Sequence, residues 1–260
     1  MRRTKIIATL GPATDDPDTL SELLRAGVDV VRLNFSHGDR DDHRRRIDAV
    51  RAASETMGRY IAVLGDLQGP KIRIQRFADG PVTLVEGREF LLDPDLPVDA
   101  GDESRVGVAY PDLADDLVDG DRLLLDDGQI VLRVTAIEGQ RIRSVVELGG
   151  VLSNNKGINK QGGGLSAPAL TEKDRDDLRW AAENDLDWVA VSFVRSAADL
   201  EEARHCLRSA GGTALIVAKV ERAEAVDELE SIIEAADAVM VARGDLGVET
   251  GYAGLTGLQK

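Results

Sequence analysis

The chain has 260 residues, of which 43% are apolar and 30% are charged. This balance is typical of a globular protein and excludes collagen-like, disordered and membrane-spanning classes. The formal net charge of −15 argues against a general nucleic-acid binder or a protein of anionic membranes. The single cysteine excludes an intrachain disulfide and a cysteine-based zinc cluster, so we expect a cytoplasmic protein.

Short apolar runs alternate with amphipathic helical patterns in the first part of the chain. Asp16 as N-cap, Pro17 at the first helical position and Gly27 as the stop delimit the first helix. The pattern predicts strands at 5–10, 28–34 and 60–66, and helices at 17–26 and 41–57.

The rhythm breaks between residues 71 and 168, where no convincing amphipathic helix is found. Turn signals at 126–128 (DDG) and 138–140 (EGQ) separate apolar runs there. The expected strands lie at 90–92, 122–125, 129–137 and 141–148. We therefore predict a small all-β domain, a β-barrel, inserted into the series of strands and helices.

The alternation resumes after residue 168, with a capping-box pattern (TEKD) at 171–174. Helices are expected at 171–184, 197–210 and 223–235, and strands at 187–193, 214–219 and 238–242. Strands that are apolar on both faces and separated by helices predict a parallel sheet, either a barrel or a doubly wound sheet. The predicted domains are 1–70, 71–168 and 169–260.

Polar residues gather where the predicted strands end, which is where active sites of parallel α/β folds lie. Arg32, Asn34 and Ser36 alternate with apolar residues, so in extended backbone they share one face. This set indicates a binding site, and an ordinary polar layer of a barrel interior is the alternative interpretation.

The third strand ends in an acid, Asp66, followed by a Gly-Pro turn at 69–70 and two cations, Lys71 and Arg73. These residues are typical of an active-site loop. A domain linker with solvated charges explains the same residues equally well.

Lys219 and Glu221 also share a face, either as a mutual salt bridge or as parts of a site. Gly244 and Asp245 follow the last strand, in a turn sequence that is a weak signal by itself. Glu221 and Asp245 are the carboxylate pair that we place on neighbouring strand ends, and Mg²⁺ typically takes one or two protein carboxylates. With Arg32 and Lys219 beside them, they predict a pocket for a phosphorylated carboxylate.

Six segments resemble those of pyruvate kinase and follow in the order of that family. They are 5–12 (KIIATLGP), 31–38 (VRLNFSHG), 65–73 (GDLQGPKIR), 192–195 (SFVR), 218–221 (AKVE) and 241–249 (VARGDLGVE). The resemblance implies a (β/α)₈ TIM barrel, the A domain, interrupted after strand three by a mobile B domain. It also implies phosphoryl transfer from phosphoenolpyruvate to ADP, which gives pyruvate and ATP in the last step of glycolysis.

The resemblance implies a role for each matching residue. Lys219 and Arg32 would be catalytic, and both would bind substrate together with Gly244 and Asp245. The cofactor would be Mg²⁺ or Mn²⁺, held by Glu221 and Asp245. Residues implied near the nucleotide are Asn34, His37, Arg73, Lys156 and Asp127, and those of a monovalent-cation site are Asn34, Ser36, Asp66 and Leu67.

Two residues depart from the family pattern at the monovalent-cation site. Lys71 lies where some members carry a glutamate, and its ammonium can stand in for K⁺, which argues against a K⁺ requirement. Leu67 replaces the more usual threonine, whose contact to the cation is a backbone carbonyl, so this change is expected to be harmless.

The sequence stops after the sixth strand, without strands seven and eight or a C-terminal domain, so the barrel is expected to be incomplete. Exposing several hundred Å² of apolar interior costs on the order of 10 kcal/mol. The isolated chain is therefore expected to aggregate and to have little activity, whereas the full-length protein is expected to be a homotetramer.

Two other functions fit the residues. One is a different metal-dependent barrel enzyme that binds phosphoenolpyruvate or pyruvate, and which needs neither a B domain nor ADP. The other is an inactive remnant that binds a partner through its open sheet edges.

Overall fold

The computed structural model describes residues 3–260, which divide into two compact units. The first unit runs to Pro70 and continues in Pro168–Val220 and Glu228–Met240. The second unit comprises Lys71–Ala167, Glu221–Asp227 and Val241–Lys260. Chain segments that are distant in sequence therefore build each unit.

The first unit contains a mixed α/β fold around a curled, parallel half-barrel sheet, as the alternating sequence pattern predicts. The sheet order is β1-β2-β3-β12-β13-β14, and the first five of these strands run parallel. The strands are β1 (Ile7–Thr9), β2 (Val30–Asn34), β3 (Ala62–Asp66), β12 (Trp188–Val191), β13 (Leu215–Val220) and β14 (Ala238–Val241).

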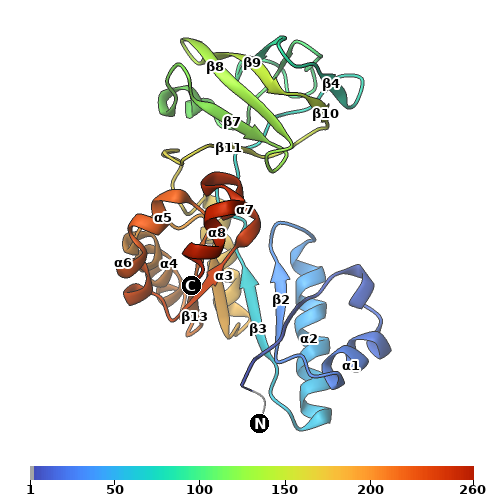
Figure 1. Cartoon of the computed structure of the whole chain (residues 1–260). Coiled ribbons are helices and arrows are strands. Elements are labelled where there is room, and N and C mark those ends of the chain that lie inside the picture. Colours follow the sequence, from blue (N-terminus) through green and yellow to red (C-terminus); the bar gives the residue numbers. More distant parts are fainter. Residues whose placement is uncertain (1–2) are drawn as a thin grey trace. The chain divides into compact units, whose positions relative to one another are not determined.

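Helices connect these strands, and Figure 1 draws α2 beside β2. The helix starts follow the predicted caps: Asp16 accepts the Thr19 N–H at 2.8 Å, and Thr171 accepts the Asp174 N–H at 3.1 Å. The helical segments are η1 (Pro12–Thr14), α1 (Pro17–Arg25), α2 (Arg40–Met57), α3 (Glu172–Glu183), α4 (Ala197–Ser209) and α6 (Leu229–Ala235).

The single helix predicted at 223–235 is wrong. The chain forms α5 (Ala223–Asp227) and α6 as separate helices, with Glu228 between them at φ −99° and ψ 13°. The two helices belong to different compact units and bury different apolar residues, Ala225 and Ile232. Tertiary packing therefore interrupts a pattern that is continuous in sequence.

The second unit contains a six-stranded sheet of order β11-β7-β8-β9-β5-β6 and a two-stranded sheet of β4 and β10, drawn from green to yellow in Figure 1. Asp126, Asp127 and Gly128 all have positive φ and form the turn before β8. The strands are β4 (Val82–Leu84), β5 (Glu89–Leu92), β6 (Arg105–Val106), β7 (Arg122–Leu125), β8 (Ile130–Glu138), β9 (Arg141–Leu148), β10 (Gly150–Leu152) and β11 (Ile158–Lys160).

Three helical segments of the second unit were not located by the sequence pattern. A 3₁₀ helix, η2 (Pro111–Asp116), lies within the segment expected to be entirely β. After β14 the chain forms α7 (Arg243–Thr250) and α8 (Tyr252–Leu258). No helix among residues 3–260 has both the length and the apolar character that crossing a membrane requires.

Candidate active site

Three charged side chains meet at the ends of β2, β3 and β13 in the first unit. Asp66 is only 1% exposed. Its Oδ2 atom lies 2.6 Å from both Nε and Nη2 of Arg32. Its Oδ1 lies 3.1 Å from Nζ of Lys219, which is 9% exposed. Two cations and one carboxylate leave one net positive charge, which suits a small anion.

Two hydroxyl groups that sequence reasoning did not assign complete this cluster. Nζ of Lys219 donates to Ser192 Oγ at 2.6 Å, and Nη1 of Arg32 donates to Thr9 Oγ1 at 2.9 Å. Ser192 directly follows the apolar run of β12, so its place at a strand end was the available signal. Asp66 and these hydroxyl groups hold both cations, so their positions are fixed before any substrate binds.

The turn after β3 packs tightly against Ser192 and Phe193. A Cβ on Gly69 would lie 2.7 Å from Phe193 Cδ2 and 2.9 Å from Ser192 Cβ, and Gly69 has φ +66°. Phe193 itself has φ +54°, which is uncommon for a bulky residue. Glycine is therefore required at position 69 for Ser192 to lie where Lys219 donates to it.

The residues implied for a monovalent cation, and His37 among those implied for the nucleotide, lie in the same unit. Asn34 pairs with Asp66 in the sheet register, and its Oδ1 accepts the Ser36 N–H at 3.1 Å. The Leu67 carbonyl accepts the Ser192 hydroxyl at 2.8 Å, and His37 is exposed. These contacts do not test the implied roles in binding a cation or the nucleotide, so those roles stay predictions.

A second group of predicted site residues lies in the second unit. Nζ of Lys71 lies 3.4 Å from Oδ1 of Asp245 and 3.7 Å from Oδ1 of Asp127. Lys156 pairs with Asp126 at 2.7 Å, and Arg73 donates to the Asn155 carbonyl at 2.9 Å. Glu221 is 2% exposed, and Gly244 lies in the first turn of α7 beside Asp245.

The donor set at Glu221 and Asp245 fits a hard divalent cation. Carboxylate oxygens are the donors that Mg²⁺ and Mn²⁺ take, and the Lys71 ammonium at Asp245 shows that this carboxylate faces a cation. No group of three or more His, Cys, Asp or Glu side chains suited to a metal occurs among residues 3–260. Two protein carboxylates leave coordination positions for water and substrate oxygens, as is usual for Mg²⁺.

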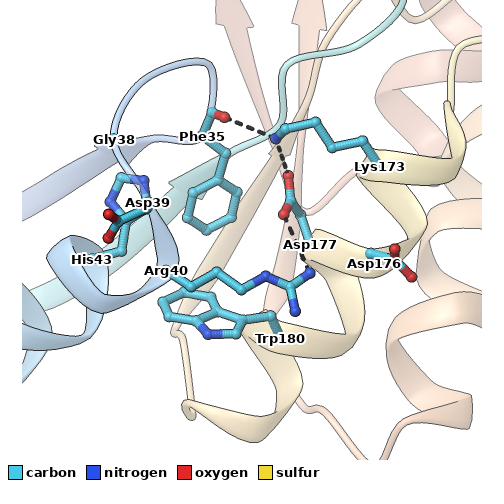
Figure 2. Close-up of a pocket in the computed structure, with 9 residues that line it drawn as sticks. All are labelled: Phe35, Gly38, Asp39, Arg40, His43, Lys173, Asp176, Asp177 and Trp180. Carbon is cyan, nitrogen blue, oxygen red and sulfur yellow. Dashed lines mark hydrogen bonds and ion pairs between the residues drawn. The ribbon is translucent and has the colours of Figure 1, made fainter.

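A cavity of about 480 Å³ lies between α2 and α3 in the first unit (Figure 2). The rings of Phe35, His43 and Trp180 contact one another edge to face, with centroids 5.2–6.3 Å apart. Asp177 accepts from Lys173 Nζ at 2.6 Å and lies 3.9 Å from Arg40 Nη2. The lining residues are Phe35, Gly38, Asp39, Arg40, His43, Lys173, Asp176, Asp177 and Trp180.

Burial changes the acid-base properties of two of these residues. His43 is 5% exposed, and neither ring nitrogen makes a hydrogen bond of ordinary geometry. Burial, and then the charge of Arg46, lower the pKa of His43. Burial raises the pKa of Asp177 against the opposing effect of Lys173. The imidazole is therefore held in its neutral form.

The parallel half-barrel sheet, with charged side chains near the ends of its strands, defines an α/β barrel-type protein. Comparison with known proteins narrows this class. A family model described as pyruvate kinase, barrel domain, matches residues 1–260. The chain belongs to the pyruvate kinase family.

Several curated relatives support this assignment. The chain is 54% identical over 263 residues to pyruvate kinase II of Salmonella typhimurium and 52% identical over 263 residues to pyruvate kinase of Haemophilus influenzae. Each alignment covers 100% of this chain and 55% of the relative. Pyruvate kinase of Mycobacterium tuberculosis is 49% identical over 95% of this chain and 52% of its own length. The chain thus spans about half the length of the curated relatives it matches.

Proposed function

We propose that this chain provides the phosphoryl-transfer site of a pyruvate kinase, which converts phosphoenolpyruvate and ADP to pyruvate and ATP. The observation that carries the proposal is the Arg32–Asp66–Lys219 cluster, with its net positive charge at the strand ends of a pyruvate kinase barrel domain. Relatives that are about 50% identical to this chain in sequence are named pyruvate kinase. The half-barrel sheet is then part of an eight-stranded barrel interrupted by the B domain.

Lys219 is the residue that we place beside the transferring phosphoryl group. Phosphoryl transfer depends on positioning and charge neutralisation more than on covalent chemistry with the protein. Asp66 and Ser192 fix the ammonium group of Lys219, so no reorganisation is needed as negative charge moves to the enolate oxygen. Arg32, fixed by Asp66 and Thr9, is the proposed contact to the substrate phosphate in the first unit.

Glu221 and Asp245 are the proposed ligands of Mg²⁺ or Mn²⁺. When bound, the ion neutralises charge on the phosphoryl and enolate oxygens. Asn34, His37, Arg73, Lys156 and Asp127 are the proposed nucleotide contacts. Asn34, Ser36, Asp66 and Leu67 are the proposed monovalent-cation residues, and the ammonium of Lys71 is the proposed substitute for K⁺.

The ligands, location and assembly that we propose follow from the reaction and from the composition of the chain. Phosphoenolpyruvate, pyruvate, ADP and ATP are the proposed ligands, and nucleic acids and membranes are not. The lone cysteine supports a cytoplasmic location, and a homotetramer is the proposed assembly of the whole protein.

The test is ADP-dependent consumption of phosphoenolpyruvate, measured with purified protein through the pyruvate it forms. Lys219→Met should lower kcat by at least about 10³-fold, because it removes a fixed charge at the reacting atoms. Binding of Mn²⁺ should change little in this variant. Consumption of phosphoenolpyruvate without ADP would instead indicate the other class of barrel enzyme, and near-normal turnover of the variant would refute the role of Lys219.

A further inference from the structure

We infer that Glu249 is a positioning residue that sets the separation of the two proposed metal ligands, Glu221 and Asp245. This inference rests on the proposed function, because it concerns the metal site assigned there. Glu249 belongs to the segment 241–249 that resembles the family motif, yet none of the implied roles uses it. All three residues lie in the second compact unit.

The carboxylate of Glu249 joins two segments that each carry a proposed ligand. Glu249 lies on α7, four residues and about one helical turn after Asp245. Its Oε2 accepts the backbone N–H of Ala223 at 3.0 Å. Ala223 follows Glu221 by two residues, so this one hydrogen bond joins the segment that carries Glu221 to α7.

The other carboxylate oxygen is held by the β-rich segment. Oε1 of Glu249 accepts from Nδ2 of Asn159 on β11 at 3.2 Å, and the backbone carbonyl of Glu249 accepts the Gly162 N–H at 3.2 Å. Glu249 is 4% exposed and Asn159 is 5% exposed. Buried hydrogen bonds to a charged acceptor are costly to break, so this arrangement is held firmly.

The chain after β11 also packs onto the segment that follows Glu221. Nη2 of Arg222 donates to the Leu165 carbonyl at 2.9 Å, and the Gly164 N–H donates to the Glu224 carboxylate. A Cβ on Gly163, where φ is +79°, would lie 2.6 Å from Glu224 Oε2. Gly163 therefore allows a close approach that a larger residue would prevent.

Together these contacts hold the two segments that carry the proposed metal ligands, Glu221 and Asp245. Metal sites depend on outer hydrogen-bond partners that orient the ligands, and the loss of such a partner typically weakens binding by 10- to 100-fold. Glu249 bonds the segment beside Glu221 and lies on the helix that carries Asp245, so it acts on the ligands through the backbone. The inference is that the length of its side chain, rather than its charge alone, sets the separation of the two carboxylates.

The test is direct titration of the protein with Mn²⁺, followed by electron paramagnetic resonance of free and bound ion. Glu249→Asp keeps the charge but is one methylene shorter, so it cannot reach both donors, and Mn²⁺ affinity should fall about tenfold. Glu249→Gln keeps the length: its carbonyl accepts from Ala223, and the Asn159 amide can turn to accept from its NH₂. Affinity in Glu249→Gln should stay within threefold of the unchanged protein.

Controls separate this inference from the proposed function. Glu147→Asp shortens another carboxylate of the same unit, one that bridges Arg122 and Arg133, and should leave Mn²⁺ affinity unchanged. If Glu221→Gln abolishes binding but Glu249→Asp binds normally, Glu249 has no positioning role. If Glu221→Gln and Asp245→Asn both bind Mn²⁺ normally, the metal assignment itself is wrong.

If Glu249→Asp does not fold, Asn159→Ala is the variant that tests the inference. This variant removes only the donor from β11 and leaves α7 and the Ala223 contact in place. A fall of threefold or more in Mn²⁺ affinity supports the inference. Unchanged affinity in a folded Asn159→Ala protein overturns it.

Discussion

Asp66 has a larger part in the first unit than its implied place in a monovalent-cation site suggests. It is the buried anion that Arg32 and Lys219 share, with separations of 2.6 Å and 3.1 Å. Without this carboxylate, two buried or half-buried cations would repel each other at the strand ends. The residue thus determines where the proposed catalytic cations lie.

Among single residues, the buried imidazole of His43 is expected to make the free energy of unfolding depend on pH. The neutral ring is favoured in the folded state because burial and Arg46 lower its pKa, whereas the His37 backbone, Asp177 and Asp42 raise it less. The unfolded chain binds more protons below its His pKa of about 6.5. The contribution of His43 is therefore complete above that pH and is lost as pH falls through the lower folded pKa.

We expect His43→Phe to reduce this loss. The variant keeps an aromatic ring against Phe35 and Trp180 and removes the titrating group, so its free energy of unfolding should fall less from pH 7 to pH 5.5. Urea denaturation at a series of pH values measures the difference. His205→Gln, which removes an exposed imidazole from α4, should follow the unchanged protein. Parallel curves for His43→Phe and the unchanged protein would contradict this account.

At the scale of elements, the start of α3 also supports the turn after β3. Asp174 is fully buried and accepts the Thr171 N–H through Oδ2 at 2.9 Å, which closes the capping box predicted from TEKD. Its Oδ1 accepts the Gly69 N–H at 3.0 Å. A helix cap therefore also holds the turn that packs on Ser192.

Asp174→Ala should accordingly cost more than the loss of an ordinary cap. Thr171→Ala removes only a cap and should lower the free energy of unfolding by about 1 kcal/mol. Asp174→Ala also leaves the Gly69 N–H without its acceptor, which adds about 1–3 kcal/mol if that group stays buried. Chemical denaturation of both variants measures the difference, with Asp39→Ala at the exposed cap of α2 as a control. Equal losses in Asp174→Ala and Asp39→Ala would rule out the link to the turn.

At the scale of the whole molecule, the overall charge and the local charge have opposite signs. The chain carries a net charge of −15, yet Arg32, Lys219 and Asp66 leave a positive excess at the strand ends. The proposed anionic substrate would therefore depend on fixed local cations rather than on the long-range field of the protein. The acidic surface favours solubility and argues against other polyanions as ligands.

The two compact units have separate hydrophobic cores, which predicts separate responses to core mutations. Phe90 is 1% exposed in the core of the second unit, and Phe90→Ala should cost about 3–5 kcal/mol. Hydrogen exchange should become faster in β8 and β9 but not in β2 and β3. Leu33→Ala in the first unit should show the reverse pattern. Equal loss of protection everywhere in each variant would mean that the units unfold as one.

Local patterns in the sequence determined the α/β class, the parallel sheet and most element positions. Apolar periodicity and caps such as Asp16 and Thr171 act between residues close in the chain, so they can be read without coordinates. The family motifs also identified Arg32 and Lys219 before any geometry was known.

Only the tertiary structure decided which side chains meet. It paired Asp66 with Lys219, joined Glu249 to Ala223 and Asn159, and split the helix predicted at 223–235. It also buried His43 in the wall of a cavity, where burial disfavours the charged imidazole. Contacts of this kind join residues far apart in sequence, and their energies depend on burial and distance, which no local pattern records.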